Sequence, residues 1–241
     1  MKIFICGQKS FGKAVLKRLI NDGHTITGIA PPPQDRLADK MVAVAMSKGI
    51  PVISDCDALC SHNIPDDTDL VVSAHSHWMI SDKILKKCRY GGIGFHPSLL
   101  PRHRGRDAVR WAVHMKDSIT GASVYDLQSS KCDCGDIILQ VPIFIDASWD
   151  YHELWNNIFD VGVELISAAV KKIESGDLSR TPQDERFATW EPSWDRPQLR
   201  VNELTQLCTS GASVPPECSG CNRDCEWCTY HIAEPERFFR R

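Results

Sequence analysis

Apolar positions in the first 175 residues follow two alternating patterns. Short runs rich in Val, Ile and Phe are separated by longer segments in which apolar residues recur every three or four positions, as Val15, Leu16 and Leu19 do. The short runs are typical of buried strands, and the longer periodic segments are typical of amphipathic helices. We expect strands at residues 1–6, 24–29, 50–53, 70–74, 92–95, 122–127 and 137–145, and helices at residues 11–21, 37–47, 81–87, 107–115 and 148–174.

This order of elements predicts an α/β fold. Helices that alternate with strands connect strands running in the same direction, and they pack on the faces of the resulting sheet. We therefore expect a Rossmann-like domain with a mostly parallel, twisted sheet and helices on both faces.

The pattern is lost after the last predicted helix. Residues 177–203 are rich in Pro, Trp and charge without a helical or alternating period, so we expect a strap across the main domain. Trp190 and Trp194 would either stack on a planar acceptor such as a nucleotide or pin the strap to the domain, and we favour pinning. We assign residues 1–195 to a domain with its strap and residues 196–241 to a short Cys-rich tail.

Composition narrows the function classes. The chain has 241 residues with 28 basic and 31 acidic side chains and a formal charge of −3, so it lacks the basic excess typical of nucleic-acid binding. No apolar run approaches the roughly 20 residues that span a bilayer, and the start MKIFICG lacks the long apolar core of a signal peptide. The 11 cysteines are an odd number, which does not suit a closed disulfide framework. We expect a cytoplasmic protein without a membrane segment.

The densest chemical signal is GGIGFHPSLLPRHRG at residues 91–105. An apolar strand places His96 at its carboxyl end, the edge at which open α/β sheets bind ligands. The alternative is a core histidine bonded to a backbone carbonyl. Arg102, His103 and Arg104 follow in a segment that either forms a solvated loop or contacts an anion, and we favour the anion contact.

A second signal, SKCDCGDIILQ, spans residues 130–140. Asp133 and Asp136 stand in a Gly-containing loop between two predicted strands, where one carboxylate can meet an imidazole of the neighbouring strand. A His and Asp pair is a common acid–base unit, although Asp in a turn also serves purely local purposes. In an extended loop Cys132 and Cys134 point to opposite sides, so we expect no disulfide between them and regard them as small apolar spacers.

Together, FHPSLLPRHRG and CDCGDIILQ after an alternating N-terminal half resemble the catalytic domain of the folate-dependent formyltransferases. That family includes methionyl-tRNA formyltransferase, glycinamide ribonucleotide formyltransferase, the sugar N-formyltransferases and the hydrolase domain of 10-formyltetrahydrofolate dehydrogenase. The resemblance covers roughly residues 1–195, and FHPSLLPRHRG is most similar to the dehydrogenase version.

The resemblance implies roles for particular residues. His96 matches the catalytic histidine and Asp133 the catalytic aspartate in transfer of a formyl group from the donor cosubstrate 10-formyltetrahydrofolate. The residues that match the folate-binding segments are His77, Trp78, Met79, Ile80, Cys132, Cys134 and Asp136.

One position departs from the resemblance. The transferases carry an Asn two residues before the histidine, where it donates to the formyl oxygen, and this chain has Gly94. Loss of one such donor typically costs about 100-fold to 1000-fold in rate, and the dehydrogenase hydrolase domain also lacks the Asn. Three alternatives follow: formyl transfer to a small-molecule amine such as an amino sugar or amino acid, hydrolysis or transfer to a carrier thiol, and a catalytically idle folate-binding module. The short segment after Arg196 disfavours tRNA as the acceptor, and a homodimer stays open.

The tail contains CSGCNRDCEWC, with Cys218, Cys221, Cys225 and Cys228 as two CxxC pairs. Four thiolates suit tetrahedral zinc, which would also help to fold so short a tail. The alternatives are an iron–sulfur ligand set and a reduced, partly disordered tail rich in thiols.

Overall fold

The structure, a computed structural model, describes residues 1–32, 39–53, 59–76, 78–129, 132–191 and 194. Its strands are β1 (Lys2–Gly7), β2 (Thr25–Ala30), β3 (Leu70–Ala74), β4 (Gly92–His96), β5 (Ile119–Asp126) and β6 (Ile137–Phe144). Its α-helices are α1 (Lys9–Asn21), α2 (Lys40–Ser47), α3 (Asp82–Lys87), α4 (Ala108–His114) and α5 (Tyr151–Glu174), with short 3₁₀ turns η1 (Ser61–Asn63) and η2 (Glu185–Phe187).

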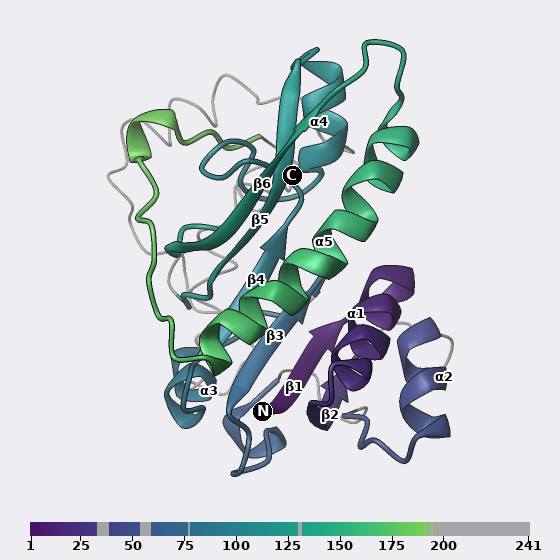
Figure 1. Cartoon of the computed structure of the whole chain (residues 1–241), viewed down its shortest axis with the longest axis vertical. Coiled ribbons are helices and arrows are strands. Elements are labelled where there is room, and N and C mark those ends of the chain that lie inside the picture. Colours follow the sequence, from purple (N-terminus) through teal and green to yellow (C-terminus); the bar gives the residue numbers. More distant parts are fainter. Residues whose placement is uncertain (33–38, 54–58, 77, 130–131, 192–193, 195–241) are drawn as a thin grey trace, which may run out of the picture.

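The strands form one six-stranded sheet in the order β2-β1-β3-β4-β5-β6 (Figure 1). The first four strands in this order are parallel, whereas β5 runs antiparallel to both β4 and β6. The predicted α/β fold with a mostly parallel sheet is therefore confirmed.

The prediction of a full strand at residues 50–53 is wrong, because this segment forms only an isolated bridge. Ile29 of β2 pairs with Val52 in a single parallel bridge, through its N–H to the Pro51 carbonyl and its carbonyl to the Ile53 N–H. Pro51 has no N–H to donate, and proline in general limits a strand to the edge of a sheet. The segment is thus a short appendage beside β2.

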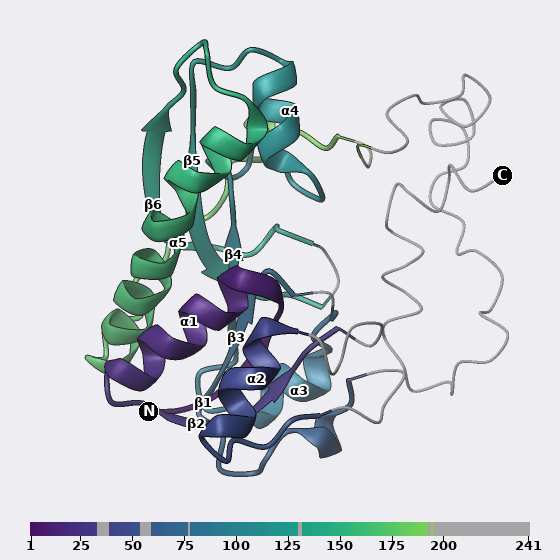
Figure 2. The same ribbon diagram turned by 90° about the vertical axis from the view of Figure 1, so that its right-hand side faces the viewer.

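The two faces of the sheet are covered differently. In β1, Ile3 and Ile5 point to a core shared with α1, α2 and α5, whereas Phe4 and Cys6 point to a smaller core. The smaller core includes Ile84 of α3. Figures 1 and 2 show α1 and α5 lying along the first face, which we call the helix face; we call the other the α3 face. The expectation of helices on both faces is confirmed.

The long helix α5 begins three residues later than predicted because of a capping box. The Asp150 carboxylate accepts hydrogen bonds from the N–H groups of His152 and Glu153, and the Glu153 carboxylate accepts from the Asp150 N–H. These contacts satisfy N–H groups that the first turn leaves without helical partners. The helix then passes along β5 and β6.

The segment after α5, described for residues 177–191 and 194, contacts the main domain at three places, and we call it the strap. It pairs with the sheet where Thr181 meets Ile137 and pairs with the segment after β4 where Trp190 meets Arg104. Trp194 packs edge-on against Trp111 of α4, with ring centroids 5.1 Å apart. Trp194 thus packs its ring against the domain, whereas Trp190 pairs through its backbone and its side chain stays 41% exposed.

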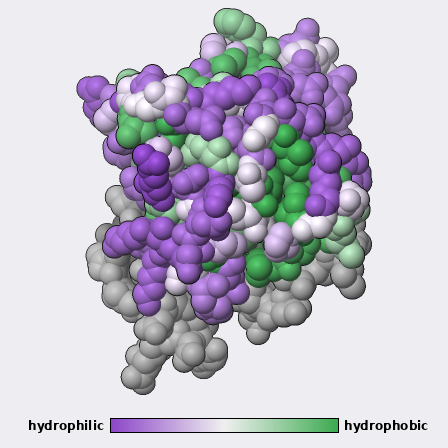
Figure 3. Space-filling view, turned by 60° about the horizontal axis from the view of Figure 1, so that its bottom comes forward, coloured by the Kyte–Doolittle hydropathy of each residue, from purple (hydrophilic) through white to green (hydrophobic). Residues whose placement is uncertain are grey.

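The face turned forward in Figure 3 is mainly hydrophilic, with smaller green apolar areas between the polar side chains. Within the described part of the chain, no helix combines the length and the apolar character needed to cross a membrane.

Candidate active site

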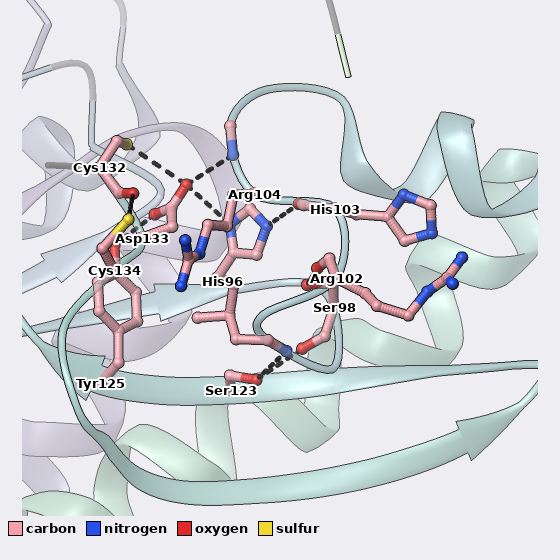
Figure 4. A network of polar contacts seen from close by, with 12 residues as sticks. His96, Ser98, Arg102, His103, Arg104, Ser123, Tyr125, Cys132, Asp133 and Cys134 are labelled. Carbon is pink, nitrogen blue, oxygen red and sulfur yellow. Dashed lines mark hydrogen bonds and ion pairs between the residues drawn. The ribbon is translucent and has the colours of Figure 1, made fainter. Parts of the chain in front are cut away.

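His96 is the last residue of β4, and its side chain is buried with 6% exposure. It points to the α3 face, like Gly94 two residues earlier, because side chains alternate along a strand. The ring Nε2 lies 2.6 Å from the carbonyl oxygen of His103, and Nδ1 lies 3.6 Å from Oδ2 of Asp133. His96 therefore makes the backbone-carbonyl contact of a core histidine and also faces the carboxylate expected for an acid–base pair (Figure 4).

Asp133 lies in the loop between β5 and β6 with a left-handed backbone conformation of φ 54°. Its Oδ1 accepts a 2.5 Å hydrogen bond from the Tyr125 hydroxyl, and its Oδ2 accepts one from the Gly105 N–H at 2.8 Å. The Cys132 thiol also donates to Oδ2, at 3.3 Å. These contacts orient a carboxylate that is 6% exposed, with Oδ2 turned toward His96 (Figure 4).

Gln183 of the strap joins the two loops that carry the pair. Its side-chain oxygen accepts from Nε and Nη2 of Arg104, and its amide nitrogen donates to the carbonyls of Asp133 and Gly135 at 2.8 and 2.7 Å. Arg104 also makes a two-point ion pair with Glu185 of the strap. Because bidentate Arg pairs are geometrically specific, we regard Gln183, Arg104 and Glu185 as a clasp that fixes the separation of the two loops.

His103 is held between carboxylates from two other segments. Its Nε2 lies 2.7 Å from Asp117 and its Nδ1 lies 3.1 Å from Glu191. Burial disfavours the charged ring, but the hydrogen bonds with Glu191 and Asp117 outweigh it and raise the pKa of His103. The two carboxylates thus fix the residue whose carbonyl contacts His96.

The anion contact favoured for Arg102, His103 and Arg104 is replaced by ion pairs within the protein. Arg102 and His103 both pair with Asp117, which follows α4, and Arg104 pairs with Glu185 of the strap. His103 and Arg104 are each only 2% exposed. The sequence could not show this, because Glu185 and Glu191 lie more than 80 residues away.

A second set of hydrogen bonds holds the turn after His96. The Ser123 hydroxyl donates to the Ser98 carbonyl at 2.6 Å and accepts from the Leu100 N–H at 3.2 Å. Gln140 of β6 donates to the Leu100 carbonyl and to the Ser123 hydroxyl. The turn is therefore anchored to the antiparallel half of the sheet.

The thiols beside Asp133 make polar contacts. Cys132 donates to the Asp133 carboxylate, and Cys134 donates to the Cys132 carbonyl at 3.0 Å. Cys132 and Cys134 form no disulfide with each other, as expected. Their interpretation as apolar spacers is wrong, because the loop is a tight turn that brings each thiol to an acceptor. The Asp136 carbonyl accepts from the Asp126 N–H and so closes this loop.

The expected folate segment after β3 lies in the apolar core of the α3 face. Trp78 and Ile80 are buried there, and the Trp78 indole donates to the Pro31 carbonyl at 2.7 Å. Met79 between them is partly exposed. His77 lies outside the described residues.

The predicted tail site, Cys218, Cys221, Cys225 and Cys228, also lies outside the described residues. Among the residues that are described, no group of three or more His, Cys, Asp or Glu side chains is arranged to hold a metal ion.

The residues that sequence reasoning missed are Tyr125, Gly105 and Gln183. Tyr125 stands beside Gly94 across the strand pair, a pairing that hydrophobic alternation cannot reveal. Gly105 acts through its backbone N–H, and Gln183 is a single amide in a segment without periodicity. No local pattern marks any of them.

Comparisons with known proteins identify the family of the chain. A family model described as formyl transferase matches residues 1–170. Mitochondrial 10-formyltetrahydrofolate dehydrogenase of Mus musculus is 30% identical over an alignment of 217 residues that covers 82% of this chain and 23% of that protein. Methionyl-tRNA formyltransferase of Halalkalibacterium halodurans is 28% identical over 84% of this chain and 67% of its own length. The chain thus spans about a quarter of the dehydrogenases it matches.

Solved structures share the fold. Glycinamide ribonucleotide transformylase 1 of Symbiobacterium toebii superposes with a TM-score of 0.66 at 18% identity, over 76% of this chain and 94% of its own. The N-formyltransferase of Helicobacter canadensis, solved with folinic acid and dTDP-3-aminofucose, gives 0.66 at 16% identity, over 81% of this chain and 72% of its own.

Proposed function

Because the chain belongs to the formyl transferase family, we propose that it transfers a formyl group from 10-formyltetrahydrofolate to an amine of a small-molecule acceptor, such as an amino sugar or an amino acid. The observation that carries this proposal is the buried pair of His96 and Asp133 at the carboxyl end of β4, with 3.6 Å between Nδ1 and Oδ2. A His and carboxylate pair is suited to move protons during acyl transfer.

The chemistry follows from the two ring nitrogens. The acceptor amine forms a bond to the formyl carbon, an oxyanion develops on the formyl oxygen, and the bond from that carbon to N10 of the folate breaks. Since Nε2 is occupied by the His103 carbonyl, Nδ1 is the nitrogen that serves the reacting groups. Protonated His96 donates toward the oxyanion, and Asp133 stabilises the charged ring while the amine proton passes to N10.

The residues present fit a folate. Trp78 and Ile80 belong to the same apolar cluster that Leu127 packs against, and a Cβ placed at Gly94 would lie 2.9 Å from Leu127. Buried apolar side chains therefore lie on the same face as the His96 pair. The loop with Cys132, Cys134 and Asp136 supplies backbone polar groups beside it. Apolar walls with a few placed polar groups are typical of sites for flat heterocyclic ligands.

The acceptor is proposed from two observations. The N-formyltransferase of similar fold was solved with a nucleotide-linked amino sugar, which supports a small amine. The formal charge of −3 over the whole chain gives no basic excess for a polynucleotide acceptor.

A second candidate is hydrolysis of 10-formyltetrahydrofolate, or transfer to a carrier thiol. Gly94 favours it, because glycine brings no side-chain donor to the strand position two residues before His96. An oxyanion with fewer donors slows attack by an amine, and a water molecule or a thiolate would then be the competing nucleophile.

The test measures tetrahydrofolate release from 10-formyltetrahydrofolate by absorbance, with and without a panel of amino sugars and amino acids, and with Asp133→Ala as the blank. We expect release that depends on one class of amine. Release at the same rate without any amine would support hydrolysis instead, and tight folate binding without release would overturn both.

A further inference from the structure

Tyr125 stands directly across from Gly94 in the antiparallel pair of β4 and β5. Paired residues in adjacent strands point to the same face, so the tyrosine ring extends over the α3 face, as His96 does. The side chain is 6% exposed. A buried tyrosine hydroxyl normally needs a hydrogen-bond partner, and here it donates to Oδ1 of Asp133 at 2.5 Å.

Gly94 leaves the space that this ring fills. A Cβ built at residue 94 would lie 2.8 Å from both Cζ and Oη of Tyr125 and 2.9 Å from Cδ2 of Leu127. Real Cβ atoms essentially never approach so closely, so a residue larger than glycine at position 94 would force the ends of the Tyr125 and Leu127 side chains to shift. Glycine within a central strand is otherwise unfavourable, and it often marks such a close approach.

The hydrogen bond decides which way the carboxylate faces. Tyr125 holds Oδ1, while Gly105 and Cys132 donate to Oδ2, the atom that lies 3.6 Å from Nδ1 of His96. Without the hydroxyl, Oδ1 would lose a donor inside a buried site, and the carboxylate would be free to rotate toward other donors. Loss of a partner by a buried charged group is costly, so the group reorients where it can.

We propose that Tyr125 is a positioning residue for the His96 and Asp133 pair, and that Gly94 is glycine because the tyrosine ring occupies the space beside it. The expected effect of Tyr125 on the reaction rate rests on the proposed formyl transfer. The positions of Tyr125, Asp133 and Gly94 relative to one another rest only on the hydrogen bond and the close approach. The space that a side chain at position 94 would take is thus filled by the Tyr125 ring, whose hydroxyl donates to Asp133.

The first test compares Tyr125→Phe with the unchanged protein in tetrahydrofolate release. Phenylalanine keeps the ring that fills the space and removes the hydroxyl. We expect kcat to fall about 10-fold or more, as loss of a hydrogen bond to a charged group predicts, with KM for the folate changed less than 2-fold and a displaced pH profile. Tyr151→Phe is the control. Tyr151 is the first residue of α5, and its ring packs on Arg110 of α4 and not on the His96 and Asp133 pair. Equal kcat and an unmoved pH profile in Tyr125→Phe would overturn the inference.

The second test is a cycle of substitutions at the two positions. Gly94→Asn is expected to lower the melting temperature strongly with Tyr125 present and much less in the Tyr125→Ala background, where space is available. Independent, additive effects would show that the two positions do not share this space.

A third measurement separates failure of the inference from failure of the proposed function. NMR of ¹⁵N-histidine-labelled protein without substrate reports the environment of the His96 ring nitrogens whether or not the protein turns over. We expect the Nδ1 signal to shift in Tyr125→Phe and to stay in place in Tyr151→Phe. No turnover in the unchanged protein together with this shift would overturn only the function, whereas an unmoved signal would overturn the positioning role.

Discussion

Two aspartates at opposite edges of the sheet show how differently a carboxylate can be held. Asp22 follows α1 at the amino edge and accepts from Ser167, Lys171 and Arg18. Asp133 lies at the carboxyl edge and accepts from a tyrosine hydroxyl, a backbone N–H and a thiol. Asp22 thus has two permanent cations beside it, whereas the donors to Asp133 are all uncharged.

The difference separates a structural site from a chemical one. Burial opposes ionisation of Asp22, but the hydrogen bonds from Ser167, Lys171 and Arg18 outweigh it and lower its pKa to about 2. Because Lys171 and Arg18 keep their charge, the Asp22 carboxylate stays ionised at neutral pH and takes no part in proton transfer. Asp133 instead faces the imidazole of His96, and a His and carboxylate pair is a common unit of acid–base chemistry.

Neutralising the two aspartates in turn gives the largest expected contrast. Asp133→Asn should lower the rate of tetrahydrofolate release on the order of 1000-fold, because a positioned acid–base group contributes about 100-fold to 10,000-fold. Asp22→Asn should leave the rate within 2-fold. Steady-state kinetics of both variants under one set of conditions makes the comparison, and an equal loss in both would show that the carboxyl edge has no special role.

Removing the clasp should have the next largest effect. Gln183→Ala deletes the amide that joins Arg104 to the carbonyls of Asp133 and Gly135. We expect kcat to fall about 10-fold to 100-fold, since small displacements of reacting groups have effects of this size. The control is Asn157→Ala, whose exposed amide donates to Glu153 within α5. An unchanged kcat in Gln183→Ala would mean that the strap does not set the geometry of the pair.

Acid should reveal the structural role of Asp22. Its folded pKa of about 2 lies below the ordinary 3.8, so its stabilising contribution is complete above about pH 4 and is lost as the pH falls through that window. The contribution amounts to about 1–2 kcal/mol after allowance for solvent screening. Urea unfolding between pH 6 and pH 2 should show a smaller pH dependence in Asp22→Asn, and parallel curves would contradict this account.

The smallest expected effect concerns His103 at the other end of the pH range. Its pKa is raised in the folded protein above the ordinary 6.5. Its charged form therefore stabilises the fold fully below about pH 6.5, and this contribution is lost as the pH rises through the raised value. The difference in unfolding free energy between the unchanged protein and His103→Gln should be larger at pH 6 than at pH 9. His62→Gln, at an exposed position in η1, should show no such trend.

Much of the fold follows from the sequence because it depends on local periodicity. The apolar stripe of α1 and the β-branched run of β3 are readable without any partner. The segment at 50–53 has an apolar run that predicts a strand, whereas Pro51 and the edge position leave a single bridge to β2. Where α5 begins is decided by the capping box at Asp150, which periodicity alone does not mark.

By itself the sequence determined the strand and helix order, the position of His96 at the end of a strand and the loop that carries Asp133. Only the tertiary structure decided that Tyr125, Gly105 and Gln183 hold this pair in place. The spacing of apolar residues depends on neighbours in the chain, so it predicts helices and strands from the sequence alone. A hydrogen bond between residues 28 or 50 positions apart depends on how strands align and where a strap crosses them, and those are properties of the folded chain.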